Sequence, residues 1–368
     1  MKRLCALFIL LAIFLCGCGN TVTGAEGDFQ TKVDKKQLIT QITPSQGEKV
    51  STVTKELETF LQRYAFGKGL SVAETVNKDI FQPVTISWEC DTTNNGYTLR
   101  YTTKQDFSDV TEVSTKEPEI QVDSLFTGCT YYWQVVTHLD SGDNYSTVFS
   151  FHTEKTPRII DIAGVYNTRD FGGYMTTNGT HRVRQGMIYR GGQLDGIKQE
   201  GKTKALNVYQ IKTDLDLRRA TEVTMDSSPL GESVNYYNIS VIDYNGAYTY
   251  TDEMRDAIGV FADEANYPIY VHCAVGRDRT GTLLFILGNL LGVQEESLYA
   301  DYEITYLTPK SYKKGDTTGH DSFSNFLNRL KQYEGQTLQE KSENDCKSSG
   351  VTQQQIDSIR SILLESLG

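Results

Sequence analysis

The alternation of apolar and polar positions changes character along the chain. From about Pro83 to Thr153 the two kinds alternate in short runs, such as VTISWEC and TYYWQVVTHL, as expected for strands with one buried face. The turn signals NNG at 94–96 and SGDN at 141–144 separate these runs. Residues 83–155 are therefore predicted to form a small all-β sandwich.

From about Ile159 onward, short apolar runs alternate with segments of helical spacing. IKTDLDLR at 211–218, YNISVI at 237–242 and PIYVH at 268–272 are the predicted strands, and residues 251–265 are a predicted helix. The last segment begins with Thr352 and Gln355 at the spacing of a capping box. Residues 156–368 are therefore predicted to be an α/β domain, with a mostly parallel central sheet flanked by helices.

The first residues read as an export signal. A basic start precedes an apolar run from Leu4 to Leu15, which has the length of a signal-peptide core and is short for a membrane span. The run ends in LCGC, which resembles a bacterial lipobox with Cys18 at the lipidated position. We expect residues 1–18 to be a lipoprotein signal peptide, with a plain secretory signal as the alternative. The protein is then exported and anchored by acyl chains to the outer side of the cell membrane. Residues 19–82 are expected to be a linker with one short helix near 54–66.

Composition and charge narrow the classes of function. The chain has 368 residues and a net charge of −11, which argues against nucleic-acid partners. Because this overall charge repels anions, any anion-binding site must concentrate positive potential at one place in the molecule. No spacing of histidine and cysteine indicates a metal site, and no cofactor is expected. Outside the signal segment the cysteines are sparse and show no disulfide framework. A disulfide between Cys90 and Cys129 is an alternative that the sequence does not favour.

One short turn, VHCAVGRDRTG at 271–281, concentrates reactive residues between a predicted strand and a predicted helix. Cys273 and Arg279 flank five residues, a loop of the size that wraps one tetrahedral oxyanion with backbone N–H groups. Arg279 would grip two phosphoryl oxygens, and the positive potential would keep Cys273 as a thiolate nucleophile. Thr280 would hydrogen-bond the thiolate, and His272 would fix the shape of the loop from below.

The turn resembles the signature of the cysteine-dependent protein tyrosine phosphatase superfamily, His-Cys-x5-Arg-Ser/Thr. Four other segments resemble motifs of bacterial phosphatases that act on tyrosine, serine and phosphoinositides: NTRDFGGY at 167–174, IYRGGQLDGI at 188–197, LDLRRATEV at 215–223 and DYEITYL at 301–307. Gly191 stands where that family usually has serine. The resemblance covers about residues 158–366 and implies a two-step, metal-free mechanism through a cysteinyl phosphate.

The resemblance also assigns roles by position. Substrate-binding residues would be Ala274, Val275, Gly276, Arg277 and Thr280, and the supporting residues would be His272, Arg169, Asp170, Asp216, Arg218 and Asp243. The general acid is predicted to be Asp278, with Asp243 as the alternative. Arg277 replaces the family's usual lysine and keeps a positive charge that would favour a second phosphate on the substrate.

Three functions remain in view. The leading hypothesis is an exported, lipid-anchored phosphatase for phosphotyrosine in proteins, and its nearest variant acts on phosphoinositides or inositol polyphosphates. A surface-binding lipoprotein with an inactive phosphatase domain is the hypothesis from another class. The β-rich segment resembles a fibronectin type III domain, through Trp88 and the TYYW run, and would serve as a spacer or bind a surface protein or glycan.

Overall fold

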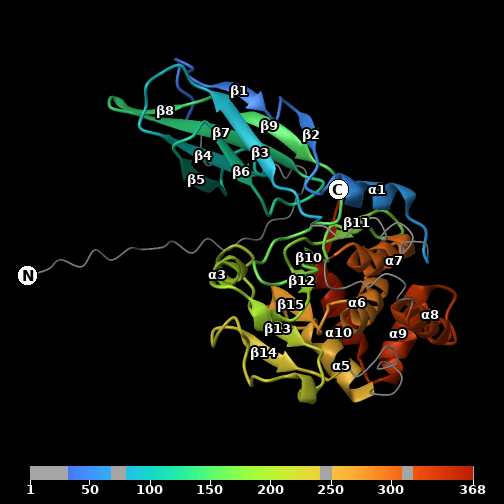
Figure 1. The fold of residues 1–368 in the computed structure, drawn as a ribbon. Helices are drawn as coiled ribbons and strands as arrows, with labels where there is room; N and C mark the ends of the chain where they lie inside the picture. Colours follow the sequence, from blue (N-terminus) through green and yellow to red (C-terminus); the bar gives the residue numbers. More distant parts are fainter. Residues whose placement is uncertain (1–31, 68–79, 241–250, 309–317, 368) are drawn as a thin grey trace, which may run out of the picture.

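A five-stranded sheet forms the centre of the C-terminal domain in the computed structural model, which describes residues 32–67, 80–240, 251–308 and 318–367 (Figure 1). The strand order is β10 (Arg169–Asp170), β12 (Ile188–Gly191), β15 (Ile269–His272), β13 (Thr213–Asp216) and β14 (Asn235–Asn238). Only β10 pairs antiparallel; the other three pairings are parallel. The mostly parallel sheet expected from the sequence is therefore confirmed, although the strand predicted at 237–242 begins two residues earlier, at Asn235.

Both faces of this sheet are covered, which explains the uninterrupted apolar pattern of its central strand. Ile269 and Val271 of β15 belong to one buried cluster and Tyr270 belongs to another, because successive side chains point to opposite faces. Helix α3 (Gln199–Asn207) covers the Tyr270 face. The other face carries α5 (Thr251–Val260), α6 (Asp278–Leu290), α7 (Glu295–Ile304), α8 (Thr318–Leu330), α9 (Leu338–Ser348) and α10 (Gln353–Leu363).

Helix α6 is the centre of this helical layer. Every residue from Thr280 to Leu290 is buried, and the helix packs against α5, α7, α8 and α9. The last helix, α10, has the capping box that the sequence indicates, with Thr352 and Gln355 bonding each other's backbone N–H groups. Next to it, β16 (Leu364–Ser366) pairs with β11 (His181–Val183). Within the described residues, no helix is both long and apolar enough to cross a membrane.

The N-terminal domain consists of two sheets around one apolar cluster that contains Trp88 and Trp133. One sheet is β1 (Thr40–Thr43), β3 (Val84–Glu89) and β6 (Glu119–Val122). The other is β2 (Glu48–Val50), β9 (Phe149–Thr153), β7 (Thr130–Leu139), β4 (Tyr97–Thr102) and β5 (Thr111–Thr115), with β8 (Gly142–Tyr145) against β7. The likeness to fibronectin type III remains a prediction. Cys90 and Cys129 are both free thiols.

The expected linker at 19–82 is wrong for residues 40–63. Residues 40–50 supply β1 and β2, which are half-exposed strands, and their short polar pattern hid them in the sequence. Helix α1 (Lys55–Arg63) was expected, but it is not part of a linker. Its Leu57 and Phe60 are fully buried in the core of the C-terminal domain.

The two domains are joined by a buried arginine, Arg158. Its guanidinium donates to Asp170 Oδ2 at 2.8 Å and to the Leu125 carbonyl of the sandwich at 3.1 Å. It also lies over the Phe126 ring, 4.3 Å from the centroid. Close by, Gln185 exchanges two hydrogen bonds with the backbone of Thr127. Both side chains of the Arg158–Asp170 pair are almost fully buried, so the sandwich is docked through desolvated contacts.

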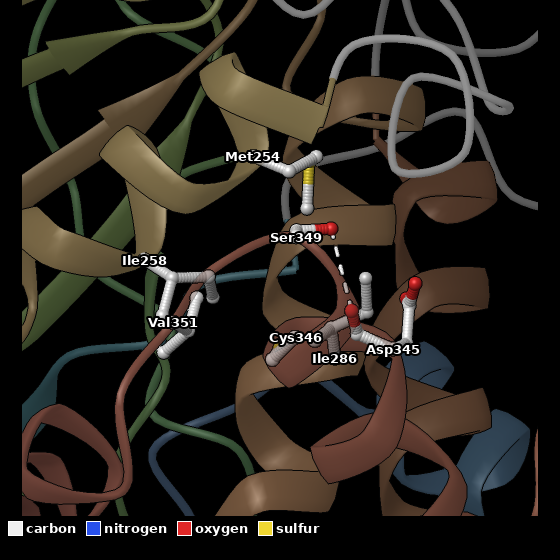
Figure 2. Close-up of a pocket in the computed structure, with 7 residues that line it drawn as sticks. All are labelled: Met254, Ile258, Ile286, Asp345, Cys346, Ser349 and Val351. Atoms are coloured by element: carbon white, nitrogen blue, oxygen red, sulfur yellow. Dashed lines mark hydrogen bonds between the residues drawn. The ribbon is translucent and has the colours of Figure 1, made fainter.

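Another buried acid, Asp345 of α9, lies within the helical layer. It borders a small void between α5, α6 and α9 that Met254, Ile258 and Cys346 also line (Figure 2). The side chain is 2% exposed, and its Oδ1 has no hydrogen-bond partner among the described residues. Burial raises the pKa of Asp345 to about 6, against the opposing effect of a hydrogen bond from Tyr333.

The Arg158–Asp170 pair gives a prediction about stability. Arg158→Leu leaves a carboxyl group buried without its counter-charge, which costs about 3–5 kcal/mol. Urea unfolding should therefore show a large fall in midpoint. The matched variant Arg255→Leu, at an arginine that pairs only with exposed aspartates, should change little. Equally small effects from both variants would contradict a stabilising role of the buried Arg158–Asp170 pair.

Asp345 gives a prediction about pH. Its folded pKa lies above that of the unfolded chain, so the wild type loses stability as pH rises from about 4 to about 6 and does not regain it above that range. Asp345→Asn does not titrate and should gain about 2 kcal/mol over the wild type at pH 8 relative to pH 4.5. Urea unfolding at the two pH values measures this difference. Asp357→Asn, at an exposed site of α10, is the control and should show no such pH-dependent gain.

Candidate active site

The Cys273–Arg279 loop leaves the carboxyl end of β15, the third of the five strands in the sheet order, and enters α6. In parallel sheets this edge is where ligands bind. The register places His272 level with Gly191 of β12 on one side and Asp216 of β13 on the other. Helix α6 starts at Asp278, so its unpaired N–H groups lie at the end of the loop. A local strand-turn-helix pattern therefore brings the reactive cysteine to a preformed anion site.

Cys273 is buried, with 2% of its surface exposed. Burial raises the pKa of its thiol, but the charge of Arg279 and the hydroxyl and backbone N–H of Thr280 more than offset this, so the pKa lies below its usual value. The Thr280 hydroxyl is buried and has no hydrogen-bond partner among the described residues. It is therefore available to the sulfur, and the local contacts favour a thiolate.

Arg279 is held in place by Glu222, from the short η2 turn (Ala220–Glu222). The two groups form a bidentate pair, with Nη1 to Oε2 at 2.6 Å and Nη2 to Oε1 at 3.1 Å. The Arg279 side chain is 13% exposed, so the guanidinium is mostly desolvated. Glu222 is the last residue of the LDLRRATE motif, and its task here is to orient the arginine.

His272 supports the loop from below through both ring nitrogens. Nε2 lies 2.9 Å from Asp214 Oδ1, and Nδ1 lies 3.1 Å from the carbonyl oxygen of Cys273. Burial lowers the pKa of this imidazole, but Asp214 outweighs burial and raises it to about 9. His272 is therefore a cation at neutral pH, and both nitrogens donate. Asp214, which sequence reasoning missed, is held in turn by the Ser228 hydroxyl.

The carbonyl oxygens of the loop are bound by residues outside it. Asn167 Nδ2 donates to Val275 O at 3.0 Å, and Arg190 Nη2 donates to Gly276 O at 2.7 Å. Tyr166 OH and the backbone N–H of Gln193 both donate to Ala274 O, at 3.3 and 3.2 Å. Because these carbonyls face outward, the N–H groups of the same peptide units face the interior of the loop, where an oxyanion would sit.

Asp301 of α7 connects Arg190 with Arg169, which in turn donates to Asn167. Asp301 Oδ1 accepts from Arg169 Nε at 2.8 Å, and its Oδ2 accepts from Arg190. Burial raises the pKa of Asp301, but the two guanidinium groups outweigh burial and hold it below the usual value. Sequence reasoning had placed Arg169 but not Asp301 or Arg190, although both lie in motifs that it singled out.

Two glycines bring the loop against β12. A Cβ at Gly276 would lie 2.0 Å from Gly191 O, and the residue has φ +72°, so only glycine fits. Gly191, where the related family has serine, is equally constrained, because a Cβ there would lie 2.2 Å from the hydroxyl of Tyr270. The departure from the family pattern thus has a steric cause.

The structure separates some of the predicted residues. Asp170 does not support the loop as expected; it accepts from Arg158 and from the backbone N–H groups of Gly172 and Gly186, because its side chain points away from the loop. Arg218 pairs with Asp216 and Asp195 beside His272. Asp243 and Cys18 lie outside the described residues. Within the described residues, no group of three metal-binding side chains is present.

Asp278 lies at the first position of α6, beside the thiol. Its carboxylate accepts from Arg277 Nε at 2.6 Å and from Tyr302 OH at 3.3 Å. A general acid must reach the leaving oxygen of the substrate, whereas this carboxylate is engaged by Arg277 and Tyr302. A role as acid therefore requires that Arg277 release it, for example toward a bound phosphate.

Comparisons with known proteins agree on one family. The family model described as "Tyrosine phosphatase family" matches residues 160–365. A protein of Cupriavidus necator named "Putative tyrosine-protein phosphatase H16_A0669" is 24% identical over 164 residues, which cover 38% of this chain and 59% of that protein. The chain therefore spans less than two thirds of that relative's length.

Solved structures are more distant. The core catalytic domain of the PP-IP phosphatase SIW14 from S. cerevisiae, in complex with citrate, is 16% identical with a TM-score of 0.30, covering 44% of this chain and 88% of that domain. A second structure of the Siw14 catalytic core is 19% identical with a TM-score of 0.27, covering 42% of this chain and 95% of that core. At these scores neither structure bears on the function of this chain.

The thiolate gives a direct prediction. Thr280→Val removes the hydroxyl that is available to the sulfur and should raise the pH midpoint of alkylation of Cys273 by iodoacetamide by about one unit. The rate is followed by mass spectrometry between pH 4 and 9. Thr282→Val is the matched control, since Thr282 is an equally buried threonine of the same helix. A shift of equal size in Thr282→Val would contradict the role of the Thr280 hydroxyl in lowering the pKa of Cys273.

Proposed function

The chain belongs to the tyrosine phosphatase family, and on that premise we propose that it hydrolyses phosphate monoesters through a cysteinyl-phosphate intermediate. The observation that carries this proposal is the lowered pKa of Cys273 inside a loop whose Ala274, Val275 and Gly276 carbonyl oxygens are bound from outside. A nucleophile and an oxyanion site are thus held together by structure that is in place before substrate arrives.

The first step is attack of Cys273 Sγ on phosphorus. The S–P bond forms as the P–O bond to the leaving group breaks, and three phosphoryl oxygens lie against the loop N–H groups and Arg279. Arg279 already presents its guanidinium edge-on to a carboxylate, Glu222, and can present its remaining N–H groups to the phosphate. The leaving oxygen takes a proton from the general acid, for which Asp278 is our first candidate and Asp243 the second.

The second step is hydrolysis of the intermediate. Water attacks phosphorus, the S–P bond breaks, and inorganic phosphate leaves. The carboxylate that gave its proton in the first step takes one from this water. The Thr280 hydroxyl stabilises the departing thiolate, which is the same contact that lowers the thiol pKa in the free protein. The backbone loop, Arg277 and Thr280 form the substrate-binding set, and no metal or cofactor takes part in the proposal.

Phosphotyrosine in proteins is the proposed substrate class. The variant substrate is a phosphoinositide or inositol polyphosphate, which the positive charge of Arg277 at the loop would favour once its pairing with Asp278 is released. We further propose export and lipid anchoring at Cys18, from the lipobox resemblance alone. A sandwich that binds a surface protein or glycan would then place the catalytic domain beside that partner.

The test is hydrolysis of p-nitrophenyl phosphate by residues 19–368, with a reductant and EDTA present. Turnover should persist in EDTA and fall at least about a thousandfold in Cys273→Ser, because the substitution removes the nucleophile. Cys90→Ser, in the sandwich, is the matched control and should retain wild-type turnover.

Two outcomes would contradict the proposed mechanism. An inactive wild type would favour the surface-binding lipoprotein with an inactive phosphatase domain. Activity that survives in Cys273→Ser would mean another nucleophile.

A further inference from the structure

A pocket adjoins Tyr166 and Asn167, two residues that bind the loop. Its volume is about 190 Å³, and it lies between the segment 159–169, residues 80–81 and Thr308. Ile159, Ile160, Val165 and Phe81 supply most of the apolar lining. An apolar cavity of about 150 Å³ is large enough to hold a benzene ring. This pocket therefore has room for one apolar or aromatic side chain, and is smaller than a site for a drug-sized ligand.

The pocket shares its wall with the proposed active site. Tyr166 and Asn167 both line it, and both hold carbonyl oxygens of the loop, at Ala274 and Val275. Burial and the charge of Cys273 raise the pKa of Tyr166, which also indicates that its hydroxyl lies near the thiolate. Tyr166 is thus the residue that connects the pocket with Cys273, and from it we take the pocket to lie within reach of a residue one or two positions from the phosphorylated one, since each extended residue spans about 3.5 Å.

The polar groups of the pocket do not suit a second phosphate. Arg169 is its only cation among the described residues, and all five N–H groups are used. Nε donates to Asp301 Oδ1, Nη1 to the backbone and side-chain oxygens of Asn167, and Nη2 to Asp301 O and Thr305 Oγ1. The remaining charge in the lining is the half-exposed carboxylate of Asp161, which pairs with Lys204 Nζ at 3.9 Å, so the lining offers a second phosphate no cation that is not already paired among the described residues.

We propose that this pocket is an accessory subsite that binds an apolar or aromatic side chain next to the phosphorylated residue of a peptide. The inference rests on the proposed phosphatase activity and deepens it, because it selects a phosphopeptide over an inositol polyphosphate. An inositol ring offers only hydroxyl and phosphate groups to a wall of isoleucine, valine and phenylalanine. A leucine or phenylalanine side chain gains from leaving water there.

The test compares peptides that differ in one residue. Each hexapeptide contains one phosphotyrosine, four glycines and a variable position one or two residues before or after the phosphotyrosine. For at least one placement, kcat/KM should be about tenfold higher or more with leucine than with glycine, the size of discrimination that one apolar group in a pocket provides. Val165→Phe fills the pocket and should abolish the ratio, while Val208→Phe, the same change at an exposed site, should preserve it.

A second variant tests the subsite in case Val165→Phe does not fold. Phe81→Ala enlarges the pocket and should shift the preferred residue from leucine toward tryptophan. A leucine-to-glycine ratio near one in the wild type, or a ratio that neither pocket variant changes, overturns the subsite while the glycine peptide is still hydrolysed. Faster hydrolysis of inositol hexakisphosphate than of every peptide also overturns it. No turnover of any substrate, p-nitrophenyl phosphate included, instead overturns the phosphatase proposal itself.

Discussion

The carbonyl oxygens of Ala274, Val275 and Gly276 must face away from Cys273 if the loop is to bind an oxyanion, and most of the surrounding structure serves that requirement. A tight loop left to itself would expose both kinds of backbone group to the ligand. Here Tyr166, Asn167 and Arg190 each hold one carbonyl oxygen from outside. These three residues come from segments that precede the loop by about a hundred positions or fewer, so the loop acquires its shape only when the whole sheet has formed.

Charge around the site is balanced. Among the described residues, the cations in and around the loop include Arg169, Arg190, Arg218, His272, Arg277 and Arg279, and the carboxylates that pair with them are Asp301, Asp195, Asp216, Asp214, Asp278 and Glu222. A chain with net charge −11 therefore attracts an anion here through oriented dipoles rather than through a surplus of positive side chains. The buried pairs fix the direction of those dipoles, which explains why so many ionised groups are kept out of water next to one small loop.

Local pattern made the central features predictable. The apolar strand, the glycine-containing turn and the apolar helix are consecutive in sequence, so β15, the loop and α6 could be placed from the sequence. Long-range pairing could not. Arg169 and Asp301 are 132 residues apart, and no spacing rule connects them. The strands β1 and β2 were missed for a related reason: three or four half-exposed residues carry too little periodicity to distinguish an edge strand from a polar linker.

Strand β10 is only two residues long, yet its two side chains serve different parts of the molecule. Arg169 faces Asp301 and the phosphate loop, while Asp170 faces Arg158 and, through it, the sandwich. Successive residues of a strand point in opposite directions, so a slip of one position would exchange the two roles and lose both. Insertions and deletions usually accumulate at the margins of a sheet during evolution. At β10 the length of the chain is fixed, because a single added residue would disrupt the active site and the domain junction together.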